Sequence, residues 1–154
     1  MLEVNPQCLV EALARALGDM AFLAPLPWEG PRPAPVTNPV VASVRCHGAL
    51  DGIVELLADE GFGAAIAANM LGLDAGDEKS LSATDDALRE LMNITAGLVM
   101  RGLGDGAPGS LALDVPTVAR GFAPDHWDAF LADPRGAILD AEGRPVAIRV
   151  RRAA

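Results

Sequence analysis

One stretch near the middle of the chain has apolar residues at every third or fourth position, which matches the 3.6-residue turn of an α-helix. The residues on this side are Leu88, Leu91, Met92, Thr95, Leu98 and Val99. The glycine-rich sequence "GLGDGAPG" follows and cannot easily continue a helix. We therefore predict a long helix that begins at Thr84, or at Ser82, ends at about Arg101 and turns this side toward a protein core.

Two further segments have the pattern and the ends of helices. Residues 6–22 repeat the three-and-four spacing, with Asn5 placed to cap the first turn and Pro6 at its start. The alanine-rich segment that follows Asp59, a second capping candidate, stops at Gly72. The polar, acidic stretch "DAGDEKSLSAT" separates this helix from the long one, and we predict a loop there.

Strand patterns fill much of the remaining chain. Residues 40–47 and 52–58 are β-prone runs on either side of "GALD", which predicts a hairpin with Gly48 and Gly52 in its turn. We also predict strands for "SLALDVPTVARG", "HWDAFLA" and "PVAIRVR", with "DAEG" as the turn before the last. Helices that are separated in sequence from antiparallel pairs indicate an α+β fold, with long helices packed on a mostly antiparallel sheet.

The segment 25–39 differs from both patterns because it contains six prolines. Proline has no backbone N–H and favours extended backbone, so we expect a semi-rigid connector that wraps around the domain. The alternative is a ligand motif for a proline-binding partner.

Length and charge restrict the class of protein. A chain of 154 residues with 51% hydrophobic residues has the size of one domain, which we place at residues 1–154. The net charge of -9 argues against nucleic acid and against anionic membranes, and the basic group Arg149, Arg151 and Arg152 is small. No apolar run approaches the roughly 20 residues of a membrane-spanning helix, and the N-terminus does not resemble a signal peptide. We expect a cytoplasmic protein.

Few side chains suit a metal site. Cys8 and Cys46 lack CxxC spacing, and only His47 and His126 could join them as metal partners. We interpret both cysteines as buried free thiols, which fits a reducing compartment, and we predict no metal site in this chain.

The long helix also carries a polar stripe. At about 100° per residue, Asp86, Glu90, Asn93 and Gly97 fall within a wedge of roughly 60° on the side opposite the apolar residues. Gly97 weakens the helix by about 1 kcal/mol relative to alanine, but it leaves the backbone open to a partner. The simpler explanation is an ordinary exposed face whose acids favour the helix dipole. Helix geometry alone leaves both explanations open.

A longer pattern bears on this choice. Asp86, Glu90, Asn93 and Pro116 together spell D-x3-E-x2-N-x22-P. This pattern resembles the signature of the CheC, CheX and FliY family of bacterial chemotaxis phosphatases. The hairpin glycines, "NMLG" at 69–72 and "ELMNITAG" at 90–97 occur in the same order as in that family, so the resemblance covers roughly residues 5–122. The single copy of the motif is similar to CheX rather than to CheC, and CheX-like proteins are homodimers.

The resemblance implies a protein-aspartate phosphatase that acts on a phosphorylated CheY-like receiver domain in chemotaxis. In that reaction Asn93 would orient the attacking water and Glu90 would pair with a lysine of the receiver, while Asp86 and Gly97 would contact the partner. The receiver would supply Mg²⁺, so no cofactor of this chain's own is implied. Pro116 has no acid or base and would shape the strand behind the helix.

Three alternatives remain open at this point. The chain could be non-catalytic, either as a module that binds a receiver without hydrolysis or as a structural module like the related folds of the flagellar switch. It could be a phosphatase for a response regulator outside chemotaxis. A general small-ligand-binding domain is the least favoured, because no convergent polar pocket is evident in the sequence.

Overall fold

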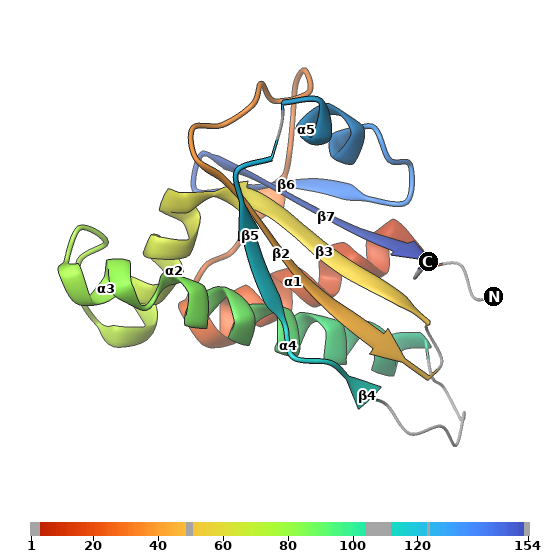
Figure 1. Ribbon diagram of the computed structural model, residues 1–154, viewed down its shortest axis with the longest axis horizontal. Helices are drawn as coiled ribbons and strands as arrows, with labels where there is room; N and C mark the ends of the chain where they lie inside the picture. Colours follow the sequence, from red (N-terminus) through yellow and green to blue (C-terminus); the bar gives the residue numbers. More distant parts are fainter. Residues whose placement is uncertain (1–3, 49–50, 104–111, 123, 153–154) are drawn as a thin grey trace.

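The protein is built around one antiparallel sheet, shown in Figure 1. The computed structural model describes residues 4–48, 51–103, 112–122 and 124–152. Its seven strands follow the order β1-β6-β7-β3-β2-β4, and β5 also pairs with β2. The strands are β1 Leu26–Pro27, β2 Pro39–His47, β3 Gly52–Asp59, β4 Ala112–Leu113, β5 Thr117–Arg120, β6 Ala137–Ala141 and β7 Arg144–Arg152.

Helices cover the two faces of the sheet unequally. They are α1 Pro6–Ala21, α2 Glu60–Leu71, α3 Glu78–Ser82, α4 Thr84–Leu103 and α5 Pro124–Leu131. The main core joins α1, α2 and α4 to one face, whereas α5 and part of the connector cover residues of the other. Neighbouring residues show the division, because Leu56 belongs to the main core and Leu57 to the smaller one. This is the predicted α+β arrangement of long helices on an antiparallel sheet.

The predicted ends of the first two helices are confirmed by their hydrogen bonds. The Asn5 side chain accepts from the N–H of Gln7 at 2.9 Å, at the start of α1. Asp59 accepts from the N–H of Phe62 at 2.7 Å, and α2 ends at Gly72 in the left-handed conformation. These local contacts satisfy the terminal backbone groups that a helix leaves without partners.

Both predicted antiparallel turns join paired strands. In the first hairpin, β2 pairs with β3 from Pro39↔Asp59 to Cys46↔Gly52, although residues 49–50 of its turn lie outside the described residues. In the second, "DAEG" joins β6 to β7, with Glu142 and Gly143 at positive φ. The strand β6 itself, which precedes this turn, was not predicted from the sequence.

Two local predictions are wrong. The predicted loop "DAGDEKSLSAT" contains α3, because Asp77 caps the N–H of Lys79 at 2.9 Å and Ser80 is buried. The predicted strand "HWDAFLA", residues 126–132, lies in α5 as far as Leu131. Trp127, Phe130 and Leu131 are all buried there, and their three-and-one spacing places them on one side of a helix rather than on one face of a strand.

The proline-rich connector lies along the sheet and is held at a few points. Its residues Leu26 and Pro27 form β1 beside β6, and the N–H of Trp28 donates to the carbonyl of Ile138 at 3.2 Å. Farther along, the indole N–H of Trp127 in α5 donates to the carbonyl of Pro33 at 3.2 Å. The connector therefore wraps around the sheet with little regular hydrogen bonding, as predicted.

The two cysteines are free thiols, as predicted, but they differ in burial. Cys46 is buried in the main core, and this burial raises the pKa of its thiol to about 11. Cys8 is half-buried, and burial raises its pKa as well. Separately, none of the helices in the described ranges is long and apolar enough to cross a membrane.

Candidate functional site

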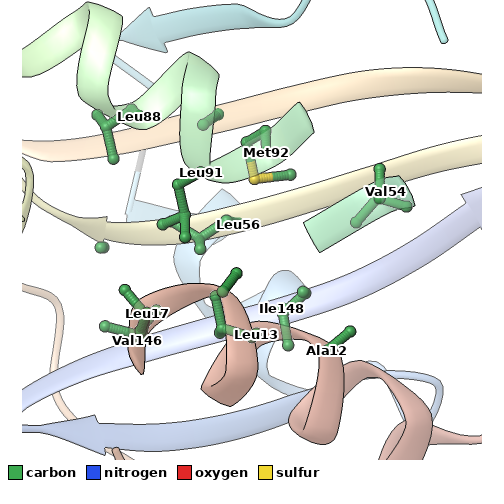
Figure 2. Close-up of a cluster of buried hydrophobic side chains, with 14 of the residues drawn as sticks. Ala12, Leu13, Leu17, Val54, Leu56, Leu88, Leu91, Met92, Val146 and Ile148 are labelled. Carbon is green, nitrogen blue, oxygen red and sulfur yellow. The ribbon is translucent and has the colours of Figure 1, made fainter. Parts of the chain in front are cut away.

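Helix α4 is fixed in place by its apolar side. Leu88, Leu91, Met92, Thr95 and Val99 are fully buried, and Leu98 is partly buried against the same core. Figure 2 shows Leu91 of α4 reaching toward Leu56 of β3, with Leu13 and Leu17 of α1 beyond. A side chain as large as leucine gains about 1.5–3 kcal/mol on full burial, so this side resists rotation of the helix about its axis.

The predicted polar stripe lies on the exposed side of this helix. Asp86, Glu90 and Asn93 are exposed, and a Cβ at Gly97 would meet nothing within 4 Å. Within the ranges that the structure describes, neither Glu90 nor Asn93 forms a side-chain hydrogen bond or an ion pair. Their spacing of three residues places both groups on neighbouring turns, where one partner surface could meet them together.

Asp86 differs from the other two because it already has a partner. Its carboxylate accepts a hydrogen bond from Arg89 at 3.0 Å, three residues later, and the Asp86 side chain is 86% exposed. Exposed pairs of this kind contribute about 0.3–0.5 kcal/mol, so a stronger cationic partner could displace Arg89.

Pro116 is buried between β4 and β5, whereas its neighbour Val115 is 81% exposed. Both short strands pair with β2, and both contact α4. Two residues before this proline, the N–H of Asp114 donates to the carbonyl of Arg45 at 2.9 Å. Pro116 therefore lies in the strand segment beside α4, with no side-chain group that could take part in proton transfer.

Arg120 is a residue that the sequence analysis missed. It lies at the end of β5 and donates to Glu60 in the first turn of α2 through Nε at 2.8 Å and Nη2 at 2.7 Å. It also donates to Asp85 in the first turn of α4 through Nη1 at 3.2 Å and Nη2 at 2.5 Å. The Arg120 hydrogen bonds lower the pKa of Asp85, and the bonds to Glu60 and Asp85 raise the pKa of Arg120.

The basic group noted in the sequence is largely neutralised within the fold. Arg149 and Arg151 both donate to the buried Glu55, at 3.0 and 2.9 Å. The Arg149 guanidinium also lies 4.2 Å from the centre of the Phe130 ring and near Asp133. These contacts belong to the sheet face opposite α4, so the arginines do not form a basic surface beside the stripe.

No metal centre is evident in the part of the chain that the structure describes, where no group of three or more His, Cys, Asp or Glu side chains could hold an ion. His47 instead contacts Asp114 at 3.1 Å, and His126 lies beside the Phe122 ring. A half-open cavity of about 370 Å³, lined in part by Trp28, Arg32 and Phe130, lies between the connector, α5 and the outer sheet face. It is thus separate from Glu90 and Asn93.

Solved structures with the same fold come from several bacteria. A chemotaxis protein CheX from Desulfovibrio desulfuricans is 18% identical, with a TM-score of 0.68 over 97% of this chain and 99% of that chain. CheX from Borrelia burgdorferi, in a complex with CheY, BeF3 and Mg²⁺, is 18% identical, with a TM-score of 0.65 over 97% and 99%. FliY from Thermotoga maritima is 18% identical, with a TM-score of 0.61 over 96% and 87%.

Sequence comparison identifies the family more directly than these distant structures do. No curated protein matches the chain. The family model for the chemotaxis phosphatase CheX matches residues 40–125, which are more than half of the 154 residues and include the stripe and Pro116. The chain therefore belongs to the CheX family of chemotaxis phosphatases.

Proposed function

We propose that this protein removes the phosphoryl group from the aspartate of a phosphorylated CheY-like receiver domain. The observation that carries the proposal is the position of Glu90 and Asn93, which are exposed and without partners in the described chain, on a helix whose other side is packed into the main core. Membership of the CheX family supports the reaction class, and the Borrelia burgdorferi CheX complex with CheY supports the class of partner.

The reaction needs little from the visiting protein because an acyl phosphate is already activated. Water attacks phosphorus in line, the bond from phosphorus to the aspartyl oxygen breaks, and inorganic phosphate and the free carboxylate result. In our proposal the amide oxygen of Asn93 accepts a hydrogen bond from this water, while its NH2 group helps to fix the orientation. The receiver holds the Mg²⁺ that neutralises charge on the phosphoryl oxygens, so this chain contributes no metal.

Glu90 has a separate role in the proposal. It pairs with the receiver lysine that faces the phosphoryl group, which places Asn93 one turn along the same helix at the phosphorus. Asp86 contributes to docking, and the open backbone at Gly97 allows the receiver to approach closely. Pro116 holds the neighbouring strand segment. We further propose that residues 1–154 act as one CheX-like domain and that the protein is a homodimer.

The decisive experiment measures the loss of phosphate from a purified phospho-receiver of the same organism. Wild-type protein should accelerate this loss, and Asn93→Ala should reduce the acceleration by about 100-fold, as expected when a positioned group is lost. Glu90→Ala should weaken binding of the receiver as well as turnover. Glu78→Ala removes an exposed glutamate of α3 and serves as the matched control, with activity unchanged.

Two results would contradict this proposal in different ways. Full activity in Asn93→Ala would exclude the proposed role of its amide. If no receiver of the organism loses phosphate faster with wild-type protein, the chain is a binding module and not a phosphatase. The homodimer is checked by sedimentation, where a species of 15.9 kDa at working concentration would rule it out.

A further inference from the structure

Arg120 connects three elements that are far apart in the sequence. Its guanidinium lies at the end of β5 and contacts Glu60 of α2 and Asp85 of α4, which are 60 and 35 residues away. Each carboxylate receives two hydrogen bonds from this one side chain. Two planar bidentate contacts match the fork of an arginine, whereas a lysine offers only a compact point charge.

The two carboxylates need a cation between them. Glu60 and Asp85 both lie in first helical turns, where the helix dipole favours negative charge. Because both contact one guanidinium, they lie close to each other, and without it like charges would repel the starts of α2 and α4. Single exposed ion pairs contribute little to stability, but bidentate geometry within a network is the arrangement in which they matter.

The start of α4 controls the position of the stripe. Asp85 precedes Asp86 directly, and Asn93 follows eight residues later, about 12 Å along the same helix axis. Beyond the stripe, Val99 and Met100 are buried in the main core and hold the other end of α4. The start of α4 is also packed, through the buried residues Thr84, Ala87 and Leu88. Loss of the Arg120 contacts therefore leaves the helix in place, but it allows a small change in the tilt of its first turns.

We propose that Arg120 is a positioning residue, which fixes the tilt of α4 through Asp85 and Glu60 and thereby aligns Glu90 and Asn93 with the receiver. The inference rests on the proposed phosphatase function. It assigns no chemical step to Arg120, which contacts neither Glu90 nor Asn93 in the structure. Since an error of about 1 Å in placing a catalytic group can reduce the rate by about 100-fold, a modest tilt is enough to affect turnover.

The test compares Arg120→Gln with Arg144→Gln. Arg144 also bridges two elements, since it donates at 2.8 Å to Asp59, the residue that caps α2. This contact does not involve α4, so Arg144 serves as the control. With a phospho-receiver as substrate, Arg120→Gln should lower kcat by about tenfold and change KM by less than about twofold. Arg120→Lys should be intermediate, and Arg144→Gln should retain the wild-type kcat.

A second measurement follows the helix itself. Hydrogen exchange in peptides that cover residues 84–90 should be faster in Arg120→Gln than in Arg144→Gln or wild type. If Arg120→Gln does not fold, Asp85→Asn removes one charge of the same network with little change of shape, and it should show the same loss of kcat.

The outcomes separate this inference from the function on which it rests. A wild type without phosphatase activity contradicts the proposed function, and the positioning role falls with it. An active wild type together with Arg120→Gln and Asp85→Asn variants of unchanged kcat overturns only the positioning role. A purely structural ion pair would lower the melting temperature and leave kcat at the assay temperature as high as in Arg144→Gln.

Discussion

The residues of the two sides of α4 alternate along the sequence but differ sharply in burial. Glu90 and Asn93 are exposed, whereas Leu91 and Met92 between them are fully buried. The buried side anchors the helix, whereas Glu90 and Asn93 on the exposed side have no internal partners in the described chain. The buried side stabilises the fold, and in the proposed function the exposed side recognises the receiver. Substitutions on or next to α4 test this division.

The largest effect on stability is expected from Leu91→Ala. Leu91 is fully buried and packs in the main core (Figure 2), so its truncation should lower the free energy of unfolding by about 2–5 kcal/mol. The measurement is urea unfolding followed by circular dichroism. Asn93→Ala, two residues away on the exposed side, should stay within about 0.5 kcal/mol of wild type. Equal losses in both variants would contradict the division between the two sides.

Gly63→Ala, on the neighbouring helix α2, tests how closely the buried side of α4 is packed. A Cβ at Gly63 of α2 would lie 2.5 Å from Cγ2 of Thr84 and 3.2 Å from Cδ1 of Leu88, both on α4. The two helices must therefore separate, and we expect a loss of about 1–3 kcal/mol in the free energy of unfolding. Thermal unfolding measures this loss. An unchanged melting temperature would show that α2 and α4 have room for a methyl group between them.

Gly97→Ala makes the same chemical change on the exposed side and should have the opposite sign. A Cβ there meets nothing within 4 Å, so alanine should stabilise the helix by about 0.5–1 kcal/mol. If the receiver approaches the backbone at Gly97, the variant should also bind a phospho-receiver more weakly. Isothermal titration and thermal unfolding together test this. A variant that is more stable and binds equally well would exclude close approach at Gly97.

The smallest effect on stability is expected when the pH is lowered and Asp85, at the start of α4, becomes protonated. Since the Arg120 bonds lower the pKa of Asp85 below its ordinary value of 3.8, this contact stabilises the fold fully above that value. The contribution is lost as the pH falls through the lower folded pKa. The difference in melting temperature between wild type and Asp85→Asn should therefore be constant above about pH 5 and shrink below about pH 4. A difference that keeps its full size from pH 5 down to pH 2 would mean that Asp85 stabilises the fold through packing.

The sequence predicted correctly those helices whose ends and apolar period depend on residues close together in the chain. The caps at Asn5 and Asp59, the stop at Gly72 and the apolar period of α4 depend on neighbours within a few residues, and the structure confirms each one. Short elements were harder. The α3 helix has only five residues, and α5 has eight whose apolar residues also fit a strand in part. Apolar patterns of this length do not distinguish the 3.6-residue period of a helix from the two-residue period of a strand.

The sequence by itself determined which side of α4 is buried and which residues it presents outward, because side-chain direction follows from helix geometry. The spacing to Pro116 also identified the family that the family model confirms. Only the tertiary structure decided that Arg120 meets Glu60 and Asp85, and that Arg149 and Arg151 are neutralised by Glu55. These contacts join residues that are 35 to 96 positions apart, and their partners depend on the order of strands in the sheet, which no local pattern specifies.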